Sequence, residues 1–315
     1  MIYVEPDNNT GGYTMYKAIK HHLNKNIIQR QKLTGGYTFQ TWLLTLSDNQ
    51  KVVFRTQKDF ETSGGRKIII SDVLEREKFF YSNVNRHIGH ICPEIFVIDN
   101  SCEHHGDTFC IMEYIEGTPL DKCFDNFDTK TKNDVLYKIG ETAARINSLQ
   151  IDSNHPYIVS RGTWEEYIIE RLRERLTPLI PNKIITQDEI DAIVEIMCGC
   201  NISKPLSFLH LDLRRTNMIY NNGNIFILDA ENCEFSDPLW EIAVIDVGNE
   251  LEPPLLEGYK NVHGKDLDIE SNLYNCFKIE RQALVTDLFL NEITNDKHMT
   301  SFHLDKFYDV KRKLL

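Results

Sequence analysis

The chain has 315 residues, of which 41% are hydrophobic and 26% are charged, and its formal net charge is −12. This length and composition predict a folded protein with two modest domains or one two-lobed domain. The acidic balance argues against non-specific binding of nucleic acid, which needs a basic surface, and leaves room for a cationic ligand.

Targeting signals are missing from the sequence pattern. The chain contains no apolar run of 18 residues, so we expect no membrane span. Its first residues, MIYVEPDNNTGG, show neither the positive region nor the apolar run of a signal peptide. We therefore expect a cytoplasmic protein whose eight cysteines are reduced thiols. Cys102, His104, His105 and Cys110 lack the paired spacing of a zinc site, which favours ordinary loop or buried residues.

The first part of the chain is predicted to be rich in β-strands. Segments with β-branched and aromatic residues, bounded by turn residues, predict strands at 27–34, 38–46, 51–56, 94–99 and 108–115. The SDNQ turn joins two of them into an antiparallel hairpin. A helix is expected over residues 72–86, because its apolar residues recur at helical spacing.

The break at Gly117-Thr118-Pro119 predicts the domain boundary, which gives a β-rich domain at 1–116 and a helical domain at 117–315. In the helical domain, apolar residues between Val135 and Ile146 follow one helix face.

Two capping-box patterns, Thr163 with Glu166 and Thr186 with Glu189, each predict a helix start, and residues 265–293 are again expected to be helical. Asn221-Asn222-Gly223-Asn224 predicts a hairpin between short strands at 218–220 and 225–228.

The segment FLHLDLRRTN, with the hairpin that follows it, carries the most specific pattern. His210, Asp212 and Asn217 match H-x-D-x-x-x-x-N, and Asp229 stands at the exit of the hairpin. We expect the hairpin to bring Asp229 back beside the loop, so that Asp212, Asn217 and Asp229 converge. Phosphoryl transfer needs such a set, because a carboxylate must accept the proton of the attacking hydroxyl and Mg²⁺ prefers oxygen ligands. Arg214 could offset the charge of the moving phosphate.

HLDLRRTN and ILDAENCEFSDPLWEIA together resemble the aminoglycoside phosphotransferase and choline kinase superfamily. The resemblance extends to LTGGYTFQTWLLTLSDNQKVVFRT, LEREKFFYSNV, FCIMEYIEGTPL and IGETAARINSL. It implies an α+β, protein-kinase-like, two-lobed fold, with ATP or GTP and Mg²⁺ bound between an antiparallel β-sheet lobe and a mainly helical lobe.

The resemblance also implies roles for individual residues. Asp212 would be the base, with Arg214 and His210 in the catalytic group. Magnesium would be held by Asn217 and Asp229. The nucleotide would be bound by Arg55, Glu77, Gly35, Gly36, Glu113 and Ile115. Here Arg55 stands where many kinases have Lys, and Glu77, with Glu75 as second choice, would pair with it.

Besides Arg55, the sequence departs from the family pattern in two places. The pair Gly35-Gly36 replaces a longer glycine motif, while Leu211 stands where protein kinases have Arg. Glu241 stands where the family usually has Asp in D-P-x-x-D-L-A, and we expect it to keep a structural role.

The acceptor is the least determined part of the prediction. Residues 231–257 contain eight acids and no Lys or Arg, so they would attract a cationic acceptor such as an aminoglycoside, or would only form a solvated face. The candidate substrate residues are Glu231, Glu234, Asp237 and Trp240, and Glu231 could instead assist the metal.

Three alternatives concern the type of activity. Ala-Glu after Asp229 and the missing A-P-E argue against a protein kinase. A choline, ethanolamine, other amino-alcohol or sugar kinase remains open, and so does a nucleotide-binding pseudokinase that acts through a partner.

Overall fold

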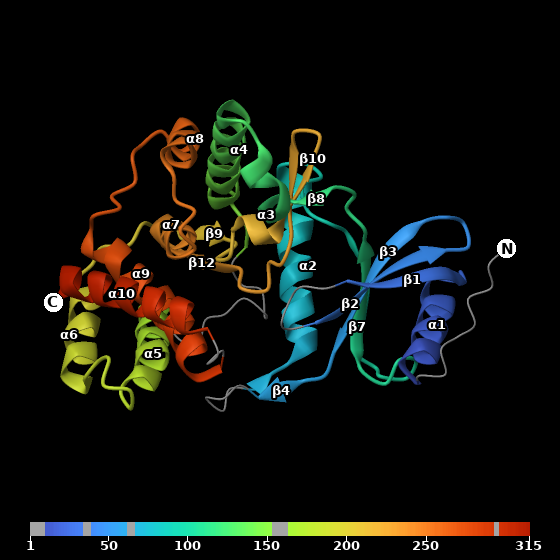
Figure 1. The fold of residues 1–315 in the computed structure, drawn as a ribbon, viewed down its shortest axis with the longest axis horizontal. Coiled ribbons are helices and arrows are strands. Elements are labelled where there is room, and N and C mark those ends of the chain that lie inside the picture. The colour runs from blue at the N-terminus through green and yellow to red at the C-terminus, as the bar shows by residue number, and fades with distance from the viewer. Residues whose placement is uncertain (1–9, 34–38, 62–66, 153–162, 293–295) are drawn as a thin grey trace. The chain divides into compact units, whose positions relative to one another are not determined.

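The computed structural model describes residues 10–33, 39–61, 67–152, 163–292 and 296–315. The chain divides into two compact units, each described here by itself (Figure 1). The first unit contains Met1–Thr118 and Ile219–Glu231, and the second contains Pro119–Met218 and Asn232–Leu315. The predicted domains, 1–116 and 117–315, instead divide the chain once and place the segment Ile219–Glu231 in the helical domain.

The first unit is built on a five-stranded antiparallel sheet in the order β1-β2-β3-β7-β6. Its strands are β1 (Ile27–Leu33), β2 (Gln40–Leu46), β3 (Lys51–Gln57), β6 (Ile95–Asp99) and β7 (Thr108–Glu113). All five lie where the sequence predicts strands, and the β2–β3 hairpin is confirmed. Two short strands, β4 (Phe60–Glu61) and β5 (Lys67–Ile68), pair with each other.

Two helices accompany this sheet. The helix α2 (Ile70–His87) covers the segment where a helix is predicted. The helix α1 (Thr10–Leu23) is not predicted, although Met15, Ala18 and Ile19 have helical spacing and are buried. These residues form one core with Val52 and Phe54 of β3. Because side chains alternate along a strand, Arg55 points to the opposite face of the sheet, where it meets α2.

The hairpin of β10 (Met218–Asn221) and β11 (Asn224–Ile227) forms a small sheet with β8 (Thr118–Pro119). Asn222 and Gly223 both have positive φ, as a tight hairpin turn requires, so the predicted hairpin is confirmed. The backbone N–H of Ile227 donates to the carbonyl of Ile91 at 2.7 Å, which explains why this segment groups with the first unit.

The second unit is mainly helical. Its longer helices are α4 (Thr129–Asn147), α5 (Trp164–Leu176), α6 (Gln187–Cys198), α7 (Pro238–Val247), α8 (Pro253–His263), α9 (Asn272–Asp287) and α10 (Lys297–Leu314). Shorter elements are α3 (Leu120–Cys123), η1 (Phe124–Asn126), η2 (Thr177–Leu179), η3 (Arg215–Asn217) and η4 (Leu288–Glu292), with strands β9 (Ser207–Leu209) and β12 (Glu234–Ser236) paired antiparallel.

Both predicted capping boxes are present, at the starts of α5 and α6. The helix predicted over 265–293 is wrong at its start, because α9 begins only at Asn272, where Ser271 caps it. The helix α10 was not predicted.

The helices α4 and α8 approach each other at backbone distance. A Cβ atom on Gly140 would lie 1.9 Å from the carbonyl oxygen of Leu255, and one on Gly258 would lie 2.0 Å from that of Tyr137. Beside this crossing, the Tyr259 hydroxyl donates to Asn147 Oδ1 at 2.9 Å, and Asn147 Nδ2 donates to the carbonyl of Phe208 in β9 at 2.9 Å. The helix crossing therefore fixes the strand that leads into the HLDLRRTN loop.

Candidate active site

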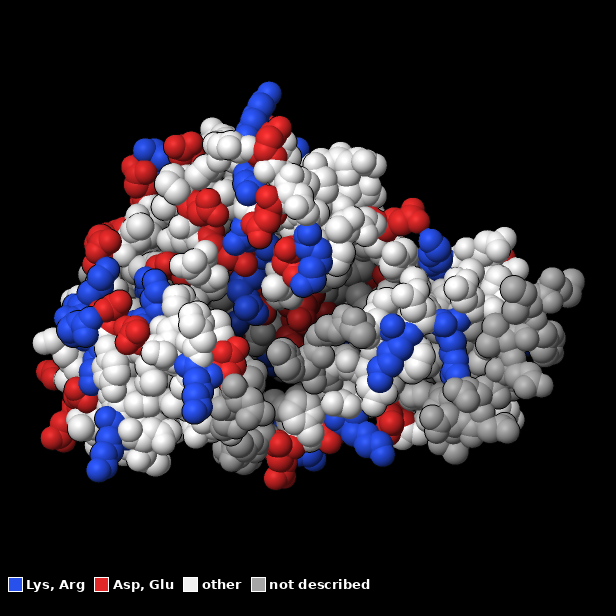
Figure 2. Space-filling view, viewed as in Figure 1, with Lys and Arg blue, Asp and Glu red and all other residues white. Residues whose placement is uncertain are grey.

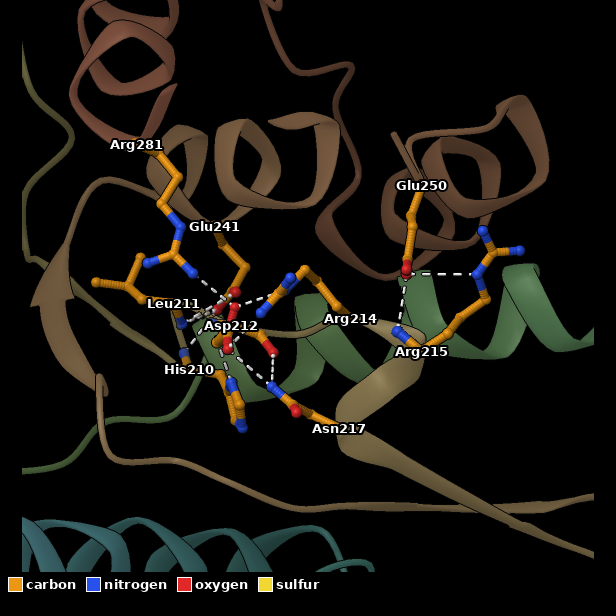
Figure 3. Close-up of polar contacts among 9 residues, drawn as sticks. All are labelled: His210, Leu211, Asp212, Arg214, Arg215, Asn217, Glu241, Glu250 and Arg281. Atoms are coloured by element: carbon orange, nitrogen blue, oxygen red, sulfur yellow. Dashed lines mark hydrogen bonds and ion pairs between the residues drawn. The ribbon is translucent and has the colours of Figure 1, made fainter. Parts of the chain in front are cut away.

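The loop from His210 to Asn217 follows β9 and ends in η3. Its first turn is held by Glu241 of α7, whose carboxylate accepts the backbone N–H groups of His210 at 2.6 Å and Leu211 at 3.1 Å (Figure 3). Leu211 has a φ of +58°, a conformation that is costly for a branched side chain and must be imposed by its surroundings. The expected structural role of Glu241 is therefore what the geometry shows.

Glu241 is itself fully buried. Burial raises the pKa of its carboxyl group to about 7, and the nearby Asp212 acts in the same direction, although the N–H donors of His210 and Leu211 oppose the shift. The proton on this group is therefore coupled to the first turn of the loop.

His210 is buried beneath the loop and contacts its backbone. Its ring is fully buried, and its Nδ1 accepts the backbone N–H of Asp212 at 3.1 Å. His210 therefore shapes the loop, and its expected place in the catalytic group stays a prediction.

The carboxylate of Asp212 receives four hydrogen bonds. Its Oδ1 accepts from Arg214 Nε and from Arg281 Nη2, each at 2.7 Å. Its Oδ2 accepts from Arg214 Nη2 at 3.0 Å and from Asn217 Nδ2 at 2.8 Å (Figure 3). Burial alone would raise the pKa of Asp212, but the charges of Arg281 and Arg214 outweigh it and lower the pKa to about 2. The group is thus a carboxylate at physiological pH.

Asn217 uses only its amide nitrogen in this network. Nδ2 donates to the carbonyl oxygen of Asp212 at 2.9 Å as well as to its Oδ2. The amide oxygen therefore turns away from Asp212 (Figure 3). A hard oxygen ligand for a cation such as Mg²⁺ is left on this side of the loop.

The end of the loop is fixed by Arg215. Its backbone N–H donates to Glu250 at 2.8 Å, and its guanidinium lies 3.5 Å from the same carboxylate and over the ring of Phe124. Glu250, one of the acids in the 231–257 stretch, therefore supports the loop.

Other acids of this stretch are also engaged inside the second unit. Asp237 caps α7 by accepting the N–H of Leu239 at 2.9 Å, and it accepts the N–H of Ser203 at 2.8 Å. Asp246 is bonded by Tyr274 and Lys278. Figure 2 shows Lys and Arg side chains interleaved with Asp and Glu over much of the visible face. Asp237, Asp246 and Glu250 are therefore held by internal contacts, and the role of the whole stretch in acceptor binding stays a prediction.

Two predicted substrate residues of the second unit are buried. Trp240 is fully buried, lies parallel to the ring of Phe277 with 5.3 Å between centroids, and donates through Nε1 to Glu280 at 3.2 Å. Glu234 is 6% exposed and accepts the N–H of Phe235 at 3.0 Å. Trp240 therefore packs in the core of the second unit between Phe277 and the guanidinium of Arg171, and its expected role in acceptor binding stays a prediction.

The first unit contains the predicted pair of Arg55 and Glu77. Arg55 Nη1 donates to both carboxylate oxygens of Glu77, at 2.9 and 2.8 Å, and its guanidinium lies 4.0 Å from the centroid of the Phe39 ring. Although burial opposes its charge, the carboxylate of Glu77 raises the pKa of Arg55. The pairing of Arg55 with Glu77, rather than with Glu75, is confirmed.

Tyr81, one helical turn after Glu77, was not predicted. Its hydroxyl donates to Glu77 Oε1 at 2.6 Å and accepts the backbone N–H of Asp229 at 2.7 Å. The carboxylate of Asp229 lies 4.0 Å from Arg55 Nη2, and its side chain is 40% exposed. Tyr81 could have been noticed, because residues four apart share a helix face.

Asp229 belongs to the first unit, whereas Asp212 and Asn217 belong to the second, so their predicted convergence remains a prediction. The carbonyl oxygen of Glu231 accepts Arg76 Nη1 at 3.1 Å. Gly35 and Gly36 lie outside the described residues.

The two predicted nucleotide residues at the end of β7 are described. Glu113 accepts the N–H of Glu94 at 3.1 Å, and Ile115 is 9% exposed. Their expected contacts with a nucleotide are not tested by this geometry.

Residues 29–269 match the sequence model of the APH family, which is described as "Phosphotransferase enzyme family". The chain belongs to this family. A search of curated proteins found no match.

Solved structures share the fold at low sequence identity. A thermostable mutant of aminoglycoside phosphotransferase APH(4)-Ia, in ternary complex with ADP and hygromycin B, is 14% identical with a TM-score of 0.66, over 94% of this chain and 97% of that one. The GDP complex of aminoglycoside 2'-phosphotransferase-IIIa is 15% identical with a TM-score of 0.65, over 98% and 100%. A Thermobifida fusca protein assigned as fructosamine-3-kinase is 12% identical with a TM-score of 0.65, over 95% and 97%.

The family and the fold establish the chain as a small-molecule phosphotransferase with an α+β, protein-kinase-like architecture. Among the described residues, no helix is both long and apolar enough to cross a membrane.

Proposed function

We propose that this phosphotransferase moves the γ-phosphate of ATP or GTP to a hydroxyl group of a small molecule, with Asp212 as the base. The observation that carries the proposal is the fixed, ionised carboxylate of Asp212 in a loop held by Glu241, with the amide oxygen of Asn217 turned outward beside it. A positioned carboxylate next to a cation ligand is the arrangement that phosphoryl transfer needs.

In this mechanism the acceptor hydroxyl donates a hydrogen bond to Asp212. The hydroxyl oxygen attacks the γ-phosphorus, the bond between that phosphorus and the bridging oxygen breaks, and the nucleoside diphosphate leaves. The proton passes to Asp212 late, because a carboxylate with a pKa of about 2 is too weak a base to ionise an alcohol before the attack. Arg214 turns from Asp212 to the transferred phosphate and offsets its charge.

We further propose that Asn217 and Asp229 are the magnesium ligands. Their donors fit that ion, because one supplies an amide oxygen that Asp212 does not use and the other a carboxylate with a 40% exposed side chain. A bound magnesium ion would neutralise negative charge on the nucleotide phosphates. In the first unit, Arg55 would pair with those phosphates, oriented by Glu77 and Tyr81.

The acceptor is proposed to be a hydroxylated amine, with an aminoglycoside as the first candidate. The hygromycin B complex and the assigned fructosamine-3-kinase support this class, because both names refer to amine-bearing sugars. Among the acids of residues 231–257, Glu234, Asp237, Asp246 and Glu250 make internal contacts and add no support to this argument. Choline, ethanolamine, amino alcohols and simple sugars are the alternative acceptors.

The test is a nucleotide-consumption screen with ATP and GTP over aminoglycosides, choline, ethanolamine, sugars and amino alcohols. With the acceptor that responds, Asp212→Asn should lose at least about 100-fold in kcat, because it removes the proton acceptor but keeps the shape. Nucleotide affinity, measured by calorimetry, should stay within a few-fold of wild type. Full activity in this variant would overturn the proposal.

A nucleotide-binding pseudokinase is the alternative from another functional class. It predicts nucleotide binding without turnover on any acceptor, including water. Detectable magnesium-dependent transfer or hydrolysis that Asp212→Asn abolishes would exclude it.

A further inference from the structure

Asp212 is saturated with donors in this structure. An ionised carboxylate offers about four acceptor positions, and Arg214, Arg281 and Asn217 fill two on each oxygen. A base must nevertheless come within hydrogen-bond distance of the acceptor hydroxyl. At least one of these donors therefore has to leave before the reaction.

The two arginines differ in how firmly they are placed. Arg214 belongs to the loop itself, its side chain is 35% exposed, and its stem lies over Gly248, where an added Cβ atom would be 2.9 Å from Arg214 Cδ. Its departure would free one position on each oxygen of Asp212. Arg214 is thus the donor that can exchange.

Arg281 reaches Asp212 from another direction. It lies in the middle of α9, its side chain is 11% exposed, and one guanidinium nitrogen points at Asp212 Oδ1 (Figure 3). Its helix neighbours Phe277 and Glu280 are fixed by Trp240, which stacks on one and donates to the other. A residue on such a packed helix does not follow the loop.

We propose that Arg281 is the positioning residue of the catalytic base: it keeps hold of Asp212 Oδ1 when Arg214 leaves for the phosphate, and so directs Oδ2 toward the acceptor hydroxyl. This inference rests on the proposed function of Asp212. Arg281 acts through Asp212 and touches neither nucleotide nor acceptor.

The charges of the site point the same way. Asp212 and Glu241 are buried side by side, and a buried carboxylate that loses all of its cationic partners is costly. When Arg214 turns to the phosphate, Arg281 is the cation among the described contacts of Asp212 that stays. The second arginine therefore has a purpose that Arg214 alone could not fulfil.

The decisive variant is Arg281→Met, which keeps much of the stem that packs in α9. We expect kcat to fall by about 100-fold, because a misplaced reacting group costs about this much, while the acceptor KM and the nucleotide Kd stay within about threefold. The kcat of Arg281→Lys should lie between those of wild type and Arg281→Met.

A rescue experiment separates positioning from a purely structural role. With Arg281→Ala, guanidinium added at millimolar concentration should restore part of kcat, which a purely structural role would not allow. Arg312→Met, an exposed arginine of α10, is the matched control and should behave as wild type.

Several outcomes decide against the inference. A kcat within threefold of wild type in Arg281→Met would overturn it, and so would a raised acceptor KM at unchanged kcat, which would assign Arg281 to acceptor binding. If Arg281→Met does not fold, Arg281→Lys carries the test: a kcat loss of about tenfold at constant KM supports the inference, and a wild-type kcat overturns it. Absence of any transfer by the wild-type protein would instead refute the proposed function itself.

Discussion

The two units place charge in opposite ways. In the first unit a buried carboxylate, Glu77, holds the cation Arg55, and Tyr81 ties this pair to the backbone of Asp229. In the second unit two cations, Arg214 and Arg281, hold the carboxylate Asp212. The group proposed to act is thus the cation of the pair in the first unit and the carboxylate in the second. On the roles proposed above, Arg55 keeps Glu77 as its hydrogen-bonded counter-charge, whereas Asp212, which must release a partner, is held by two arginines.

The largest expected effect comes from breaking the pair in the first unit. Glu77→Gln should lower the free energy of unfolding by about 3 kcal/mol, because removing one partner of a buried ion pair leaves the other charge uncompensated. Nucleotide affinity should fall with it, as Arg55 loses its orientation. Urea denaturation and nucleotide titration measure the two quantities. Glu75→Gln, on the same helix but only half-buried, is the control and should change stability by less than about 0.5 kcal/mol. Equal effects in the two variants would contradict the assignment of Glu77.

The next effect concerns the support of the loop in the second unit. Glu241→Gln keeps the size of the side chain but replaces one acceptor oxygen by a donor, so at least one of the N–H groups of His210 and Leu211 faces a second donor at close range. We expect unfolding to become easier by about 1–3 kcal/mol, with a lower kcat and an unchanged nucleotide affinity. A variant as stable as wild type would show that the loop does not depend on this carboxylate.

The same carboxylate predicts a dependence on pH. Because the folded state raises the pKa of Glu241 from 4.5 to about 7, the folded protein binds more protons than the unfolded chain between these values. The contribution of Glu241 to stability is therefore fully present below pH 4.5 and is lost as the pH rises through 7. Unfolding free energies measured from pH 5 to 8 should show this decline in wild type but not in Glu241→Gln. If the unfolding free energies of the two proteins changed with pH in parallel, Glu241 would not be the group responsible.

The smallest effect tests whether the acids of the second unit are structural. Asp237→Ala removes the cap of α7 and should cost about 1–2 kcal/mol, while the acceptor KM stays within twofold. Glu257→Gln, an exposed acid of α8, should change neither quantity and serves as the control. A clear rise in acceptor KM for Asp237→Ala would restore the idea of an acidic acceptor site.

Local patterns were the predictable part of the molecule. The strands, α2, both capping boxes and the β10–β11 hairpin follow from short-range rules that act within a few residues. The Arg55–Glu77 pair was also foreseen, because the strand and helix that carry it are recognisable from the family resemblance. These features need no knowledge of how distant helices pack.

Contacts that depend on packing were not predictable. Arg281 lies 69 residues after Asp212 and belongs to no motif around the loop, so only the placement of α9 shows their contact. Trp240 is an aromatic residue of the kind that can bind a ligand, but the fold buries it against Phe277. The acids after Glu231 were read as one surface, although caps, ion pairs and loop contacts divide them. The positions of acidic residues in a sequence do not reveal which of their side chains are exposed to solvent.

The crossing of α4 and α8 has a consequence for mutational scanning. No side chain can be added at Gly140 or Gly258 without separating these helices, and the contact chain from Tyr259 through Asn147 to Phe208 transmits such a shift to the start of the loop. A screen for lost phosphotransferase activity should therefore return both glycines as strong hits. Substitutions at these glycines would inactivate the protein because they displace β9, and not because the glycines contact the substrate.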